Sequence, residues 1–213
     1  ASGRWRGRQR TRGRAGAAPL AHQSERDDPN ADADCILVHP DVRRMLLKVR
    51  STSEAMRGLA TYVAKHIDFS HNHPDPEQRV VSDDIVAILT PIVKSFFTER
   101  GFLNTSEAMQ VCAGIGYTTE WPIEQYMRDL RIAMIDEGTN HIQALDLVGR
   151  KLRINQGRLI MNLQKEVTAS LTALAANPQM AEFVKPTQKA FQTLTELTMY
   201  LAKEARQDPE LIG

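Results

Sequence analysis

The sequence has little that would place it in a membrane, in an oxidising compartment or around a metal ion. No apolar run approaches the roughly 18 residues that a membrane-spanning helix needs, and no apolar segment follows the arginine-rich start as in a secretory signal. The two cysteines, Cys35 and Cys112, form no CxxC pair, and His71 and His73 are interpreted as solvated loop residues. We therefore expect a protein of a reducing compartment, which favours the cytoplasm.

The net charge is only +1, but the positive charge is concentrated at the start of the chain. Every second residue from Arg4 to Arg14 is an arginine, and residues 1–34 contain few large apolar side chains and no periodicity. This composition predicts a disordered leader. An arginine-rich tether could also bind nucleic acid. Trp5 is its only aromatic residue, however, so nucleic acid is the less favoured partner.

Apolar residues at helical spacing dominate the rest of the chain. They recur every three or four positions, with Pro40 as a start signal, and Pro91 is expected to bend the second helix before Gly101 ends it. The helical segments expected from this spacing are about 40–68, 81–99, 105–112, 122–135, 139–152, 159–174 and 191–201. Strand alternation is absent, so the sequence predicts an all-α fold, most simply an antiparallel helical bundle.

Two short segments interrupt the helical pattern. Ala113–Tyr117 contains two glycines, which permit a close backbone approach or a positive φ. Such a turn can bind a phosphate, although the end of a helix is its more common cause. Asp136–Thr139 places two carboxylates at a bend. Acidic residues favour a helix start, whereas a carboxyl group beside apolar surface can act as a general base near neutral pH. Spacing alone leaves both interpretations of each segment open.

Two longer stretches carry a resemblance to a known family. QVCAGIGYTTEWPIEQYMRDLRI (residues 110–132) and IDEGTNHIQALDLVGRKL (135–152) resemble the last part of the acyl-CoA dehydrogenases, and the likeness extends back through ILVHPDVRRMLL and LTPIVKSFF. It is strongest to the large members with an added C-terminal helical region, the group that includes 3-methylmercaptopropionyl-CoA dehydrogenase. After the leader at 1–34, which the composition predicts, the resemblance implies the family's C-terminal helical domain at 35–152 and an incomplete helical extension at 153–213.

The resemblance also implies a reaction. The family uses FAD to oxidise acyl-CoA thioesters to 2-enoyl-CoA. Glu137 matches the glutamate of the family's EGT motif, which removes the α-proton and contacts the thioester carbonyl through its backbone amide. Gly138 would let the substrate pass closely, and Thr139 matches a residue near the flavin. His141 would be either a flavin neighbour or an exposed residue of the first helical turn.

Further expectations follow from the same match. Gln110, Ala113 and Gly114 correspond to the turn that contacts FAD on a neighbouring subunit, so a homo-oligomer and an electron-transfer flavoprotein are implied partners. Asp136 replaces an aromatic residue, and Ala113 replaces the first of two paired glycines. The family's N-terminal and middle domains are not recognisable, which favours a C-terminal fragment of the enzyme. The alternative is a catalytically inactive helical fragment that retains the family's oligomerisation surface.

Overall fold

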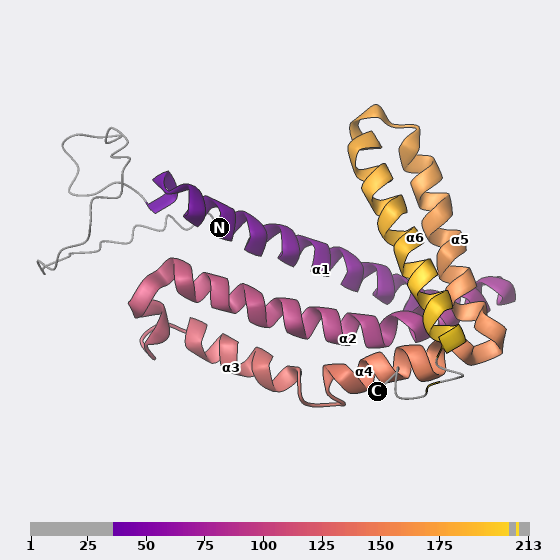
Figure 1. Ribbon diagram of the computed structural model, residues 1–213, viewed down its shortest axis with the longest axis horizontal. Helices are drawn as coiled ribbons and strands as arrows, with labels where there is room; N and C mark the ends of the chain where they lie inside the picture. The colour runs from indigo at the N-terminus through magenta and orange to yellow at the C-terminus, as the bar shows by residue number, and fades with distance from the viewer. Residues whose placement is uncertain (1–35, 205–207, 209–213) are drawn as a thin grey trace, which may run out of the picture.

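The computed structural model describes residues 36–204 and residue 208 (Figure 1). Within those ranges every regular element is helical, which confirms the all-α prediction. The predicted leader and Cys35 lie outside the described residues. No helix in the described part of the chain is long and apolar enough to cross a membrane. The elements are η1 (Ile36–Val38), α1 (Pro40–Asn72), α2 (Pro76–Cys112), η2 (Ala113–Tyr117), α3 (Ile123–Ala133), α4 (Asn140–Leu145), η3 (Asp146–Arg150), η4 (Lys151–Gly157), α5 (Arg158–Ala175), η5 (Pro178–Met180) and α6 (Ala181–Glu204).

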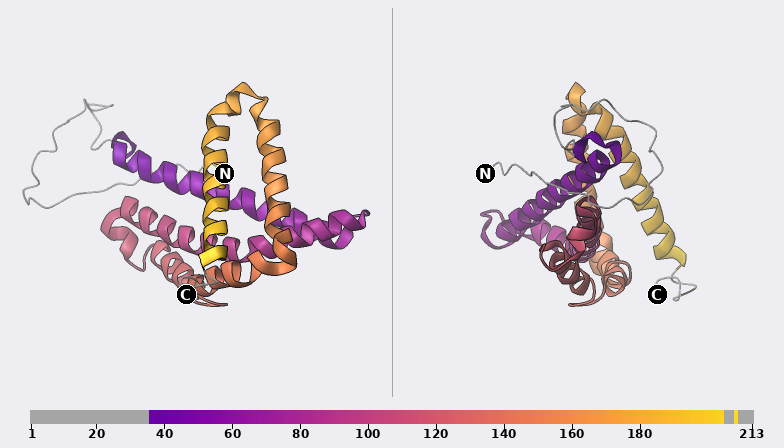
Figure 2. Two further views of the ribbon diagram at one scale, coloured as in Figure 1. Left: turned by 45° about the vertical axis from the view of Figure 1, so that its right-hand side comes forward. Right: turned by 90° about the vertical axis from the view of Figure 1, so that its left-hand side faces the viewer.

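The helices form an antiparallel layer from which a hairpin projects. α1 and α2 run in opposite directions side by side, and the chain returns along the other side of α2 through α3 and α4 (Figure 1). α5 then leaves this layer, and α6 runs back beside it, so the two stand out from the bundle (Figure 2). The arrangement confirms the predicted bundle with additional C-terminal helices.

The two long helices differ from the predicted boundaries. α1 continues to Asn72, and α2 begins at Pro76 with Asp75 as its cap, which accepts from the Glu77 N–H at 2.9 Å. The expectation that Gly101 ends a helix is wrong. Gly101 is buried within α2 because α3 packs over it: an added Cβ would lie 2.9 Å from Leu130 Cδ2. The short helix expected at 105–112 is therefore the last part of α2.

The hydrophobic core lies where α5 crosses α1 and α2. Its buried members come from α2 and α5, and partly buried side chains of α1 pack against them. The buried set is Ile85, Ile88, Leu89, Leu159 and Leu163. Apolar burial is the dominant favourable term in folding, so this crossing holds the C-terminal hairpin to the bundle.

An ion pair with a buried carboxylate reinforces the same crossing. Asp84 of α2 accepts two hydrogen bonds from the Arg158 guanidinium, at 2.7 and 2.9 Å, and one from Asn162 Nδ2 at 2.7 Å. The Asp84 side chain is 4% exposed, so its charge needs these partners. The Asp84 carboxylate in turn raises the pKa of Arg158 through hydrogen bonding and charge. The start of α5 is thus fixed to α2 in one orientation.

A second set of polar contacts joins α1 to α2 and α5 beside the core. His66 is 2% exposed, and its Nδ1 lies 3.1 Å from Ser82 Oγ, while its Nε2 lies 3.4 Å from Glu166 Oε2 without hydrogen-bond geometry. Burial lowers the pKa of His66, and the Glu166 carboxylate opposes that change. Tyr62 donates its hydroxyl to Glu166, and burial together with this bond raises the pKa of Tyr62.

Candidate functional site

The segment between α3 and α4 is a sharp bend with left-handed backbone. Glu137 has φ +56° and Gly138 has φ +84°. The left-handed region is open to glycine, but it costs a residue with a side chain on the order of 1 kcal/mol or more. Thr139 caps α4, and its hydroxyl oxygen accepts from the Ile142 N–H at 3.3 Å. The helix start therefore uses Thr139 as its cap, and Glu137 precedes the cap.

Side chains from two helices hold this bend. Lys94 of α2 donates from Nζ to the Gly138 carbonyl at 2.6 Å and to Asn140 Oδ1 at 3.1 Å. Gln143 of α4 donates from Nε2 to the Glu137 carbonyl at 3.0 Å. Neither side chain was predicted as part of the site from the sequence. The available signal was a lysine within the apolar pattern of α2, where a long cationic side chain requires a polar partner.

A hollow lies under the bend on the side of α2. It has a volume of about 530 Å³ and is lined by Lys94, Thr98, Ile132, Ala133, Asp136 and Glu137. The two neighbouring carboxylates therefore line the same space. The Glu137 side chain is exposed, so the described residues do not form the apolar enclosure expected for it. Any such enclosure requires a further surface.

The second predicted segment, at the end of α2, adopts an unexpected conformation. The positive φ expected of a glycine occurs instead at Ala113, which has φ +53° and ψ −150°. Gly114 is exposed, and an added Cβ there would meet no atom within 4 Å. Gly116 is buried against α2, where an added Cβ would lie 2.7 Å from Cys112 Cβ. Packing on the helix thus requires Gly116, whereas the surface around Gly114 is open.

The structure keeps the two predicted sets of residues apart. Gln110 is exposed in the last turn of α2, next to Ala113 and Gly114. Glu137 lies beyond the other end of α3, whose 11 residues span roughly 16 Å. His141 is exposed in the first turn of α4. One chain therefore presents two separate surfaces.

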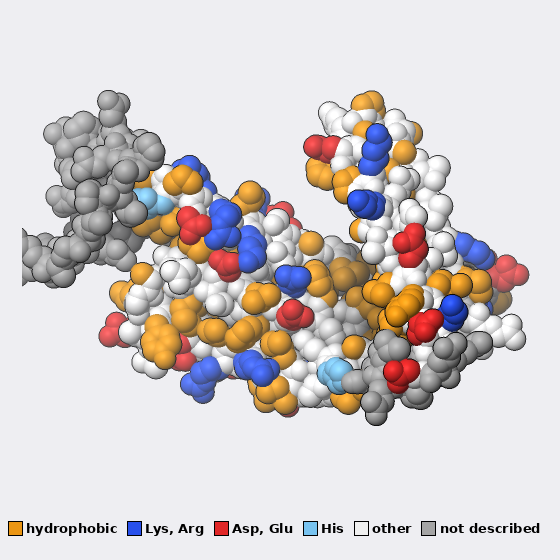
Figure 3. Space-filling view, viewed as in Figure 1, with side chains coloured by type: hydrophobic (Ala, Val, Ile, Leu, Met, Phe, Trp, Pro, Cys, Tyr) orange, Lys and Arg blue, Asp and Glu red, His pale blue; other side chains and the backbone are white. Residues whose placement is uncertain are grey.

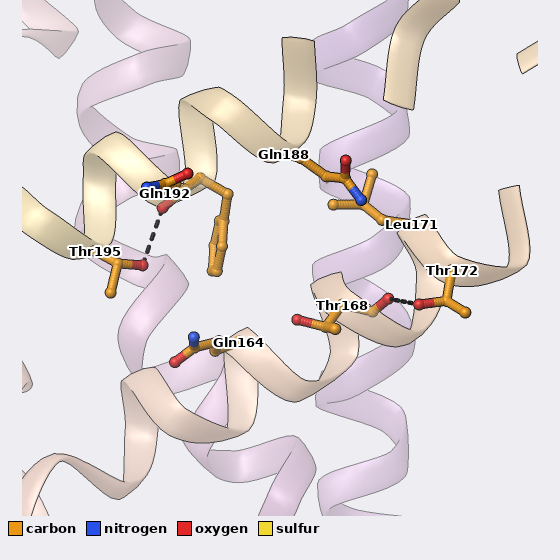
Figure 4. A pocket seen from close by; sticks show the side chains of 8 residues that line it. Gln164, Thr168, Leu171, Thr172, Gln188, Gln192 and Thr195 are labelled. Atoms are coloured by element: carbon orange, nitrogen blue, oxygen red, sulfur yellow. Dashed lines mark hydrogen bonds between the residues drawn. The ribbon is translucent and has the colours of Figure 1, made fainter. Parts of the chain in front are cut away.

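A groove between α5 and α6 is chemically different from the hollow at the bend (Figure 4). Its volume is about 240 Å³, and its lining is uncharged: Gln164, Thr168, Leu171, Thr172, Gln188, Phe191, Gln192 and Thr195. Thr172 and Thr195 donate to carbonyls of their own helices, at 2.9 and 3.0 Å. Hydrophobic side chains gather over the lower half of α6 (Figure 3). Leu197 and Tyr200 are exposed hydrophobic residues of this helix. The described lining of the groove contains no carboxylate and no histidine or lysine, unlike the hollow at the bend.

Comparisons with known proteins agree with the fold and with the two motifs. Residues 14–152 match the model of the acyl-CoA dehydrogenase C-terminal domain, which is more than half of the chain. The chain belongs to the acyl-CoA dehydrogenase family. The match begins at residue 14, within the segment that the composition predicts to be a leader.

Several curated relatives cover most of the chain. A 3-methylmercaptopropionyl-CoA dehydrogenase of Ruegeria pomeroyi is 36% identical over 86% of the chain and 31% of its own length. A butyryl-CoA dehydrogenase of Syntrophomonas wolfei is 30% identical over 87% of the chain and 30% of its own length. The broad-specificity linear acyl-CoA dehydrogenase FadE5 of Mycobacterium tuberculosis is 29% identical over 75% of the chain. The chain spans less than a third of the length of these relatives.

Proposed function

We propose that this chain takes part in the FAD-dependent α,β-dehydrogenation of an acyl-CoA thioester, with Glu137 as the base. The observation that carries the proposal is the exposed glutamate in left-handed backbone at the edge of a hollow, within the EGT motif of a family member. The relatives named above act on acyl-CoA substrates according to their names. The proposal leaves the acyl chain unspecified, because the described residues supply only one wall of a substrate site.

Each residue of the bend would have a separate role in the reaction. The Glu137 carboxylate removes the α-proton of the thioester, and its backbone amide donates to the thioester carbonyl, where negative charge develops. Gly138 adds no side chain between substrate and backbone. Thr139 already accepts the capping hydrogen bond, so its hydroxyl proton can be donated to the cofactor. FAD, when bound, supplies the acceptor for the hydride that leaves the β-carbon.

The surface at the end of α2 suits a molecule held mainly by another chain. Gln110, Ala113 and Gly114 are exposed, and the space around Gly114 is open. An exposed amide side chain and turn backbone can contact a dinucleotide without a charged residue. We propose that these three residues contact the FAD of a neighbouring subunit, which makes a homo-oligomer part of the proposal. Electron-transfer flavoprotein would accept the electrons.

The first experiment is a visible absorption spectrum of the purified chain after incubation with FAD and removal of the excess. A retained flavin band that Gly114→Trp abolishes would support the half-site at the end of α2. A colourless but folded chain would contradict flavin binding by this chain and favour the inactive helical fragment. Lys189→Met, an exposed change on α6, is the matched control.

The base is tested in a preparation that turns over acyl-CoA. Glu137→Gln keeps the size and polarity of the side chain but removes the basic carboxylate. Turnover should fall by about 10²-fold or more, because general base catalysis contributes that much. Unchanged turnover in this variant would refute the assignment of Glu137.

A further inference from the structure

Two consecutive carbonyl groups of the bend that carries Glu137 accept hydrogen bonds from side chains of two different helices. Lys94 Nζ of α2 lies 2.6 Å from the Gly138 carbonyl oxygen, and Gln143 Nε2 of α4 lies 3.0 Å from the Glu137 carbonyl oxygen. We propose that Lys94 and Gln143 are positioning residues that hold Glu137 in its left-handed conformation and so aim its carboxylate. This inference rests on the proposed function for its catalytic meaning, but not for its geometry.

The backbone conformation of Glu137 explains why these hydrogen bonds are needed. Glu137 has φ +56°, a conformation that residues with a Cβ rarely adopt unless their surroundings enforce it. The Glu137 carbonyl is bonded to the Cα that carries the carboxylate side chain, so the Gln143 bond fixes ψ of Glu137. The Lys94 bond fixes the next peptide. Together they prevent the bend from relaxing into an ordinary turn.

Lys94 is suited to this role by its donors and its partly buried position. Its bond to Gly138 is charge-assisted, and such bonds are about twice as strong as neutral ones. The same ammonium donates to Asn140 Oδ1 at 3.1 Å, and that oxygen also accepts from Thr98 Oγ1 at 3.2 Å. A single cation therefore fastens the bend and the start of α4 to α2.

Lys94 also lines the hollow that Asp136 and Glu137 line. Within the described residues its ammonium bonds to a carbonyl and an amide oxygen, and it forms no ion pair with either carboxylate. The base therefore keeps its electron pair available for a proton. A lysine paired with Glu137 would compete with the substrate, whereas a lysine bonded to the backbone orients the base without blocking it.

The test compares Lys94→Met, Lys94→Arg and Gln143→Leu with the control Lys189→Met on α6. In the isotope-labelled chain, a strong intraresidue amide-to-Hα nuclear Overhauser effect at Glu137 reports positive φ. We expect it in the parent and in Lys189→Met, and weaker in Lys94→Met and Gln143→Leu, with resonances of α1 and α5 unchanged. Lys94→Arg retains a cationic donor and should preserve part of the signal. A full signal at Glu137 in both Lys94→Met and Gln143→Leu would overturn the inference.

A kinetic measurement separates positioning from general stability. In a flavin-loaded preparation with turnover, Lys94→Met should lower kcat by about 10-fold to 100-fold with little change in KM, because misplacing a reacting group has effects of that size. Unchanged kcat would remove the catalytic part of the inference. If Glu137→Gln leaves turnover intact, the proposed function fails, and the resonance measurement still decides whether Lys94 and Gln143 hold the bend.

Discussion

The bends at Ala113–Tyr117 and Asp136–Thr139 both place a residue with a side chain at positive φ, yet they are held in different ways. Side chains of α2 and α4 bond to the carbonyls of Glu137 and Gly138. The bonds at the first bend are local: the Ala113 N–H donates to the Gln110 carbonyl, and Thr118 donates to the Ile115 carbonyl through its N–H and its hydroxyl. Glu137 is held by side chains from outside its own turn, whereas Ala113 is held by hydrogen bonds among its immediate neighbours.

The difference fits the roles proposed for the two bends. Strain that a neighbouring helix enforces fits a side chain that must point in one direction, as a base must. At the first bend the strained residue is an alanine, whose methyl group carries no chemistry. The group proposed to contact FAD at this bend is the exposed backbone beside Gly114. Substitutions at the two bends can therefore separate conformational strain, close packing and contact with an outside molecule.

The largest loss of stability is expected for Gly116→Ala. The new Cβ would lie 2.7 Å from Cys112 Cβ and 3.2 Å from the Met109 carbonyl oxygen, and neither can move without moving α2. Overpacking of this kind costs about 3 kcal/mol in the free energy of unfolding. Chemical denaturation of the parent and the variant measures the change. A loss below about 1 kcal/mol would mean that η2 lifts away from α2, since smaller changes are typical of open surface sites.

Gly138→Ala is expected to cost about 2 kcal/mol, because it adds strain at positive φ to crowding. Its φ is +84°, and the new Cβ would lie 3.1 Å from Gln143 Nε2 and 3.3 Å from Ile142 Cγ2. The Gln143 amide would then be displaced from the Glu137 carbonyl. Thermal and denaturant unfolding measure the loss, and Gly149→Ala serves as a control because a Cβ there meets no atom within 4 Å. Equal stability of the two variants would contradict the tight bend.

Ala113→Gly should increase stability, unlike the two preceding changes. Ala113 has φ +53° and ψ −150°, a region used almost only by glycine, so removing its methyl group relieves strain. Part of that gain is offset by the greater freedom of glycine in the unfolded chain. We expect a net gain of about 1 kcal/mol, measured by denaturant unfolding. A destabilised variant would indicate that the methyl group makes a packing contact that outweighs the strain.

Sequence reasoning predicted the helical content and located both bends. Periodic apolar residues are local signals, and they were sufficient for the all-α class and for a helix that begins near residue 139. The helix boundary predicted at Gly101 was wrong because this glycine makes room for Leu130, which is distant in sequence and packs directly against the surface of α2. Propensity describes glycine as a helix end, but packing decides whether the helix continues.

The side chains that hold the bend could not be predicted from the sequence for a related reason. Lys94 and Gly138 are 44 positions apart, and only the packing of α2 against the bend brings them together. Likewise, no pattern in Ala113–Tyr117 showed that Ala113 rather than a glycine has positive φ. The sequence predicts candidate site residues, while long-range contacts determine how those residues are held.

Gly114→Ala is expected to have the smallest effect on stability and to be the most informative about the first bend. An added Cβ meets no atom within 4 Å and φ is not positive, so the free energy of unfolding should change by less than about 0.5 kcal/mol. If Gly114 contacts FAD of a neighbouring subunit, the same methyl group should weaken flavin retention while Gly149→Ala does not. Denaturant unfolding and flavin titration of both variants measure the two effects. Loss of flavin at unchanged stability would show that the open surface at Gly114 contacts another molecule. Unchanged flavin affinity would contradict this contact, and close packing at Gly116 would remain the role of a glycine in this bend.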